Sequence, residues 1–275
     1  MARPSHGIVS VAALDLRRRP DHRSELRSQL LTGEVVRRRA TRGAGQWWRV
    51  ENLTDGYRGW VRSWGLVGAS ASEARRWTRM ATARAVRRYA EIREARGAGP
   101  LVSPLFWNGR VIPRENRRRW TLVELPDGCT GWVESKALRP RTRRPPSLLR
   151  RIEDLLGLPY LWGGRTPLGF DCSGFVQQVM AEQGVRLPRD AEDQYRAVQA
   201  LGPSARPTTG DLVFFGPRRG RVTHVGLVLG EGRFVHAQGR VKIGSLDAGT
   251  ALYDNELSVL KRAFGRPVRQ RVSSP

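Results

Sequence analysis

Hydrophobic and polar residues alternate in two stretches of the chain that repeat each other. Residues 48–61, WRVENLTDGYRGWV, align without gaps on residues 120–133, WTLVELPDGCTGWV. In each stretch a Trp-led run reaches an Asp-Gly pair, and a Gly-Trp-Val run follows. This pattern is typical of a β-hairpin, because glycine supplies the positive φ that the turn needs. Since only two copies occur, they predict two small β-barrels rather than a solenoid.

The residues between the two repeats have a different composition. Residues 70–96 are rich in Ala and Arg, contain neither Gly nor Pro, and are followed by Gly97. They predict a linker helix that packs against a barrel through Trp77, Val86 and Tyr89. We therefore expect a first SH3-like barrel at 1–68, a linker helix at 69–97 and a second barrel at 98–140. The alternative is that part of 69–97 belongs to the second barrel.

The pattern changes again after the Pro- and Arg-rich stretch RPRTRRPPS at residues 139–147. Adjacent prolines interrupt regular structure, so we expect a linker at 141–147 and a further domain at 148–270. This domain begins with the amphipathic run LLRRIEDLLG and a Gly-rich aromatic loop, and a second helical run starts at residue 172. Short strand-like runs separated by turns follow. Helices followed by strands predict an α+β domain.

The chain is strongly basic, with a formal net charge of +24. Such a charge suits an acidic partner such as nucleic acid, anionic lipid or an anionic wall polymer. The basic residues are spread over the whole chain without an aromatic-interleaved basic motif, so we interpret them as a compositional bias and expect no nucleic-acid partner. No apolar run of about 18 residues occurs, so we expect no membrane span. The N-terminal residues do not resemble a signal peptide, which favours a cytoplasmic location and leaves export open.

Cys172, one of two cysteines, stands where a helical pattern begins. A helix N-terminus and a nearby imidazolium both lower a thiol pKa, which favours a nucleophilic thiolate. His224 and His236 flank the predicted turn GEGR and are separated by an even number of residues, so they can share one face of a hairpin. One imidazole would act as base and the other would orient it. From these residues alone, a small buried Cys and structural histidines remain an alternative. Zinc-type spacing is absent, so no metal is expected.

Several motifs follow one another in the order of a known family: YLWGG, FDCSGFVQ, LPRDAEDQ, GDLVFF, THVGLVLG and FVHAQG. Across residues 148–268 they resemble the NlpC/P60 cysteine peptidases. The repeats resemble bacterial SH3 domains, and the first one resembles that of the γ-D-glutamyl-L-diamino acid endopeptidases of murein peptide recycling. The resemblance implies a multi-domain chain in which two SH3-like β-barrels precede an α+β papain-like NlpC/P60 domain.

The resemblance also implies an activity. The expected reaction is hydrolysis of the bond between γ-D-Glu and a diamino acid, meso-diaminopimelate or L-Lys, in cell-wall stem peptides with a free N-terminal L-Ala. The alternative is an exported hydrolase that acts on intact murein and uses its SH3 domains as wall anchors. The expected partner is a murein-derived peptide, no cofactor is implied, and the oligomeric state is left open.

Roles for individual residues follow from their positions in the motifs. The resemblance makes Cys172 the nucleophile, His224 the general base and His236 the residue that orients this base. It places the Tyr160 hydroxyl at the oxyanion. The Cys172 amide is the other expected donor, because a helix start leaves such N–H groups without an intrahelical partner.

The resemblance implies a second set of residues that bind the substrate, including its N-terminal amine: Asp171, Ser173, Glu25 and Tyr57. A buried ammonium requires a carboxylate partner, which Glu25 and Asp171 would supply. Cys129 replaces Tyr57 in the second repeat, and we expect no role for this thiol. Ala191 stands where the family has a serine, which is expected to relax specificity.

Overall fold

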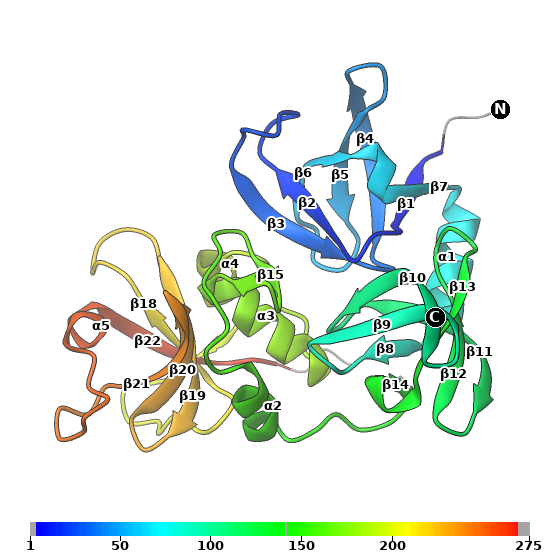
Figure 1. Ribbon diagram of the computed structural model, residues 1–275. Helices are drawn as coiled ribbons and strands as arrows, with labels where there is room; N and C mark the ends of the chain where they lie inside the picture. Colours follow the sequence, from blue (N-terminus) through cyan, green and yellow to red (C-terminus); the bar gives the residue numbers. More distant parts are fainter. Residues whose placement is uncertain (1–3, 141, 269–275) are drawn as a thin grey trace. The chain divides into compact units, whose positions relative to one another are not determined.

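Both repeated sequences form antiparallel hairpins, each within a seven-stranded sheet (Figure 1). This computed structural model describes residues 4–140 and 142–268, which fall into two units, Met1–Arg144 and Pro145–Pro275. Residues 1–3, 141, 269 and 270 of the predicted domains and linker lie outside the described residues. Both barrels belong to the first unit.

The two barrels have the same order of strands. The first contains β1 His6–Val9, β2 Ala13–Arg17, β3 Leu26–Leu31, β4 Val35–Arg42, β5 Trp47–Asn52, β6 Arg58–Arg62, the 3₁₀ turn η1 Ser63–Gly65 and β7 Leu66–Ala69. The second contains β8 Ala83–Ala85, β9 Tyr89–Ala95, β10 Ala98–Phe106, β11 Arg110–Arg117, β12 Trp120–Glu124, β13 Thr130–Glu134, η2 Ser135–Ala137 and β14 Leu138–Pro140. The sheet orders β3-β2-β6-β5-β4-β1-β7 and β10-β9-β13-β12-β11-β8-β14 correspond strand by strand.

The hairpins confirm the repeat but shift its alignment by one residue. Trp47 pairs with Arg62 in the first barrel, and Trp120 pairs with Glu134 in the second. Trp120 therefore corresponds to Trp47 and not to Trp48, as the ungapped alignment had placed it. The reason is the turn: Asn52 N–H bonds to a carbonyl five residues on, whereas Leu125 N–H bonds to one four residues on.

The prediction of a helix over residues 70–96 is wrong beyond Met80. Helix α1 spans Ala71–Met80 and begins with a capping box in which Ser70 and Glu73 bond to each other's backbone amides. The following residues form β8 and β9 of the second barrel. Their alternate residues are buried, among them Ala83 and Ala85, because the second sheet needs them as strands. Tertiary pairing thus overrides the helical propensity of an Ala- and Arg-rich segment.

Helix α1 joins the two barrels through a shared apolar core. Trp77 is 6% exposed, and its indole N–H donates to the carbonyl of Gly33 at 3.0 Å. It clusters with Ile8 and Val35 of the first barrel and Ile112 of the second. Burial of these side chains holds the barrels together as one unit.

The second unit is an α+β domain, as predicted. It contains α2 Leu148–Leu155, β15 Arg165–Thr166, β16 Gly169–Phe170, α3 Cys172–Glu182, α4 Ala191–Ala197, β17 Gln199–Ala200, β18 Leu212–Phe215, β19 His224–Gly230, β20 Arg233–Gln238, β21 Arg240–Ser245, α5 Asn255–Leu260 and β22 Lys261–Arg266. Six strands form an antiparallel sheet in the order β17-β22-β18-β19-β20-β21. Figure 1 shows α5 on one side of this sheet and α2, α3 and α4 on the other.

Helix α3 lies at the centre of the second unit. Nearly all of its residues are buried, including the apolar side chains of Phe175, Val176 and Val179. The buried carboxylate of Glu182 is held by Arg151 of α2 at 2.7 Å. This packing fixes the N-terminal end of the helix, where Cys172 stands. Within residues 4–140 and 142–268, no helix combines the length and the apolar character needed to cross a bilayer.

Candidate active site

Cys172 is the first residue of α3 and is 8% exposed. Its sulfur accepts hydrogen bonds from the backbone N–H groups of Ser173 and Val225. Val225 follows His224 in β19. The start of α3 and the start of β19 therefore meet at the sulfur. This is the arrangement that Cys172 as nucleophile and His224 as base require.

A loop of close backbone contacts lies beside the thiol. Gly163 has a φ of +77°, which favours glycine, and its amide donates to the Asp171 carboxylate at 2.9 Å. A Cβ on Gly174 would collide with the carbonyl oxygen of Gly164. The Tyr160 amide donates to the carbonyl of Gly239, which ties the same loop to the end of β20. The glycines of the motif thus allow the loop that carries Tyr160 to reach the N-terminus of α3.

Asp171 forms a buried ion pair with Arg189. The two guanidinium nitrogens of Arg189 donate to the two carboxylate oxygens at 3.0 and 2.5 Å. The amides of Gly163 and Gly174 and the hydroxyl of Ser173 donate to the same carboxylate at 2.9, 2.7 and 3.3 Å. Five protein donors therefore satisfy Asp171, which gives it a structural role at the helix cap. Its predicted contact with a substrate amine stays a prediction.

His224 and His236 contact each other through their rings. His224 Nε2 lies 2.8 Å from His236 Nδ1. They share one face, as predicted, but they do not stand directly opposite each other. Leu227 pairs with Val235, so at this register His236 is level with Gly226. The cause is an irregularity in the pairing next to the turn, which shifts the register.

Protonation states at the site are set mainly by burial. Burial raises the pKa of the Cys172 thiol to about 11, and the negative charge of Asp171 adds to the effect. Burial lowers the pKa of His224 to about 4 and that of His236 to about 3. Burial therefore acts against the thiolate that is expected from the helix N-terminus, and it favours a neutral thiol beside neutral imidazoles in the free protein.

The contact between the two neutral imidazoles determines which nitrogen of His224 can accept a proton. His224 can accept a proton on Nδ1 when its Nε2 carries hydrogen and donates to Nδ1 of His236. His236 then carries its own proton on Nε2, which is buried and has no hydrogen-bond partner among the described residues. In this tautomer His236 holds the ring of His224 in place and leaves Nδ1 ready to act as a base.

Tyr160 is suited to donate a hydrogen bond. Burial raises the pKa of its hydroxyl to about 12, and the nearby charges of Cys172 and Asp171 contribute. The phenol therefore stays protonated well above neutral pH. A protonated hydroxyl close to the sulfur is what stabilisation of an oxyanion requires.

The buried histidines predict a pH-dependent stability. Because their folded-state pKa values lie below 6.5, the unfolded chain binds more protons as the pH falls from about 6.5 to about 4. We expect this pair to contribute a loss of stability on the order of 5 kcal/mol between pH 7 and pH 4.5, roughly half from each histidine. Urea unfolding at both pH values measures the change. The variant His236→Asn should lose less stability between these pH values than the wild type. An equal loss would show that the buried histidines are not its cause.

The substrate-binding residues predicted in the first barrel lie in the other unit. Glu25 is exposed and lies 3.6 Å from the guanidinium of Arg18. Tyr57 is half-buried, with the guanidinium of Arg27 4.9 Å from its ring centroid. Cys129, its counterpart in the second barrel, is exposed. A meeting of Glu25 or Tyr57 with Cys172 stays a prediction.

Two functional contacts were missed from the sequence. Arg189 is 2% exposed and holds both Asp171 and the hydroxyl of Ser173. Gln194 donates to the carbonyl of Ser173 at 3.0 Å. Both residues lie in the motif LPRDAEDQ. A charged residue directly before a predicted helix start was the sequence feature that could have identified them.

Ala191 is buried as the first residue of α4. Among residues 4–140 and 142–268, no cluster of three metal-ligating side chains is present.

Comparison with known proteins agrees with these features. Residues 157–257 match the NlpC/P60 family, and residues 16–66 match the bacterial dipeptidyl-peptidase SH3 domain. A γ-D-glutamyl-L-lysine dipeptidyl-peptidase of Bacillus subtilis is 41% identical over 112 residues, which cover 40% of this chain and 38% of that relative. The peptidoglycan endopeptidase RipB of Mycobacterium tuberculosis is 39% identical over 105 residues, 34% of this chain and 42% of the relative. The matched regions thus span less than half of either relative.

Solved structures share the fold. An NlpC/P60 family protein from Bacillus cereus superimposes with a TM-score of 0.80 at 22% identity, covering 96% of this chain and 99% of that one. The chain therefore combines SH3-like barrels with an α+β domain of papain-like fold. That domain belongs to the NlpC/P60 family.

Proposed function

We propose that this protein is a cysteine peptidase that hydrolyses the bond between γ-D-Glu and a diamino acid in cell-wall stem peptides. The observation that carries the proposal is the thiol at the start of α3, bonded to the amide that follows His224, with His224 2.8 Å from His236. The similarity to a γ-D-glutamyl-L-lysine dipeptidyl-peptidase supports the choice of substrate.

The reaction starts from the neutral thiol. As Cys172 Sγ attacks the γ-glutamyl carbonyl carbon, His224 takes the thiol proton, so that the charged pair forms only during the attack. The tetrahedral oxyanion accepts hydrogen bonds from the Tyr160 hydroxyl and from the Cys172 amide, which a helix start leaves without an intrahelical partner. The imidazolium then protonates the leaving amine as the C–N bond breaks. Water, deprotonated by His224, releases the acyl group from the sulfur.

Recognition of the free N-terminal amine falls to the remaining predicted residues. Since five protein donors already satisfy Asp171, we assign the pairing with the ammonium to the exposed Glu25. Tyr57 would close the pocket over the L-Ala side chain, and Ser173 would contact polar groups of the peptide. Ala191 offers no hydroxyl, so we expect similar rates for meso-diaminopimelate and L-Lys substrates.

The test compares two peptides that differ only at the N-terminus, which is a free amine in one and an uncharged acetamide in the other. We expect the full chain to cleave L-Ala-γ-D-Glu-meso-diaminopimelate and to release L-Ala-D-Glu, detected by mass spectrometry. N-acetylation of the alanine should reduce kcat/KM by at least about 100-fold, because the acetylated nitrogen carries no positive charge with which Glu25 would pair. In the variant Glu25→Gln, the values of kcat/KM for the free and the acetylated peptide should lie closer together. Equal cleavage of both peptides would favour a hydrolase of intact murein instead.

A further inference from the structure

Lys242 of β21 lies directly opposite His236 of β20. Residues paired in this way point to the same face of an antiparallel sheet, so Lys242 shares a face with the imidazoles of His224 and His236. Burial is the main cause of the low pKa of each imidazole, and the positive charge of Lys242 lowers both pKa values further. The strand register and this effect of its charge together indicate that the ammonium lies near the two rings.

This face of the sheet changes from buried to exposed at Lys242. On one side of it, Phe234 and Gly244 are paired across the strands and are buried. On the other side, Gln238 and Arg240 are paired and are exposed. Lys242 itself is half-buried. A lysine in such a position packs its apolar stem against its neighbours and keeps its ammonium in contact with water, where a dissolved ligand can reach it.

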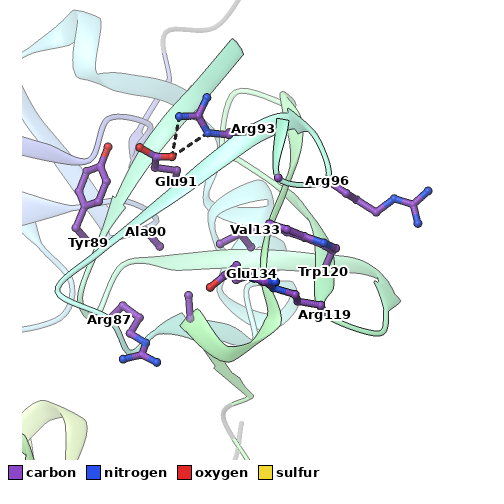
Figure 2. A pocket seen from close by; sticks show the side chains of 12 residues that line it. Arg87, Tyr89, Ala90, Glu91, Arg93, Arg96, Arg119, Trp120, Val133 and Glu134 are labelled. Carbon is purple, nitrogen blue, oxygen red and sulfur yellow. Dashed lines mark hydrogen bonds and ion pairs between the residues drawn. The ribbon is translucent and has the colours of Figure 1, made fainter. Parts of the chain in front are cut away.

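Lys242 has no ion-pair partner among residues 4–140 and 142–268. Two other cations that are half-buried or buried bond to acids. Arg93 lines a hollow of the second barrel, where its guanidinium bonds to Glu91 at 2.7 Å (Figure 2). Arg151 of the second unit bonds to Glu182 at 2.7 Å. The charge of Lys242 is by contrast available to an anion that enters from solvent.

Asp254 is the acid with the strongest effect on the neighbouring imidazole. Burial dominates the low pKa of His224, and among the acids the charge of Asp254 opposes it most. The Asp254 carboxylate caps α5, where it accepts a hydrogen bond from the Leu257 amide at 2.9 Å. This bond holds the carboxylate at the start of the helix, and the described residues include no ion pair between Asp254 and Lys242. A carboxylate of a ligand therefore has no competitor in direct contact with this ammonium.

The leaving amine of the proposed reaction lies on the side of the sulfur where the histidines stand, because His224 protonates it. In a stem peptide this amine belongs to the diamino acid, and the main-chain carboxyl carbon of that residue is roughly 2.5 Å from it. In a peptide that ends at the diamino acid, this group is a free carboxylate. The flexible four-carbon stem of Lys242 allows its ammonium to meet that carboxylate beside the imidazoles.

We propose that Lys242 binds the main-chain carboxylate of the diamino acid and thereby selects stem peptides that end at this residue. This role rests on the proposed peptidase function and concerns the leaving side of its substrate. Both meso-diaminopimelate and L-Lys carry the carboxylate, so Lys242 does not distinguish between them. A further residue attached there would replace the carboxylate by a neutral amide, and the half-buried ammonium would then lose water without gaining an anion.

The role of Lys242 is tested with L-Ala-γ-D-Glu-L-Lys and its C-terminal amide, which differ only in this carboxylate. We expect kcat/KM of the full chain, from release of L-Ala-D-Glu, to be about 30-fold higher for the free acid. The difference should lie mainly in KM, because the ion pair forms in the ground state and persists in the transition state. In Lys242→Met this ratio should fall to about three or less, and in Lys242→Arg, which keeps the charge, it should stay above about ten. A loss of packing would affect both peptides alike and leave the ratio unchanged.

Lys261→Met provides the matched control, because it removes an exposed lysine from the same unit and should leave the ratio unchanged. Equal cleavage of acid and amide by the wild type, a ratio that survives Lys242→Met, or an equal fall in Lys261→Met would overturn the proposal. Calorimetric binding of both peptides to Cys172→Ala gives the same comparison without turnover. If the wild type cleaved neither peptide, the proposed peptidase function would fail, and the binding ratio would still decide the role of Lys242.

Discussion

Replacement of Cys172 by alanine is expected to reduce kcat for the stem tripeptide by at least about 10⁴-fold. The sulfur is the only protein atom that forms a covalent bond with the substrate in the proposed reaction, so no neighbouring group can replace it. Hydrogen-bond donors at the oxyanion would still bind the peptide, so KM should change little. Release of L-Ala-D-Glu, followed by mass spectrometry in single and multiple turnover, measures the loss.

The chain supplies a matched control for this substitution. Cys129 is exposed in the turn of the second barrel, and the charge of Asp127 raises the pKa of its thiol. Cys129→Ala should therefore retain the wild-type rate. Far-UV circular dichroism of both variants checks that α3 still forms, since Cys172 contributes little apolar volume to it. A Cys172→Ala variant that cleaves the tripeptide at a rate near that of wild type would exclude the proposed nucleophile.

The parts of the fold with regular local patterns were predicted from the sequence. Asp-Gly turns between alternating runs identified both hairpins, and the motif around Cys172 identified the start of α3. The even spacing of His224 and His236 predicted their shared face. These predictions succeeded because each depends on chain-local geometry that the residues themselves determine.

The errors arose where distant contacts decide the outcome. Residues 83–95 have a helical composition, yet they complete the second sheet through pairing with β10, β11, β13 and β14. The one-residue shift of the repeat depends on the length of the turn, which hydrogen bonds across the hairpin define. Neither the sheet partners nor the turn bonds are visible in a single sequence.

The same limit applied to the chemistry of the site. A cysteine at a helix start suggests a lowered pKa, but nearly complete burial has the larger effect and raises the pKa to about 11. Burial is a property of the whole second unit and cannot be read from residues 171–173. The partner of Asp171 was similarly hidden, because Arg189 lies 18 residues away.

Arg189→Met is expected to destabilise the second unit by about 3–5 kcal/mol, because it leaves the carboxylate of Asp171 buried without its cationic partner. The side chain of Arg189 is 1% exposed and that of Asp171 is 10% exposed, so water cannot replace the lost bonds easily. Methionine has a similar length and keeps most of the packing. Urea unfolding followed by far-UV circular dichroism at pH 7 measures the change in the free energy of unfolding.

Two further variants distinguish the loss of the Arg189–Asp171 ion pair from a general effect of removing an arginine. Arg186→Met removes an exposed guanidinium three residues earlier, and it should change the free energy of unfolding by less than about 0.5 kcal/mol. Adding Asp171→Asn to Arg189→Met should recover part of the loss, since a neutral amide is less costly to bury than an unpaired carboxylate. If Arg189→Met were as stable as Arg186→Met, this ion pair would not hold the cap of α3. The position of Cys172 would then have to depend on the packing of Phe175, Val176 and Val179.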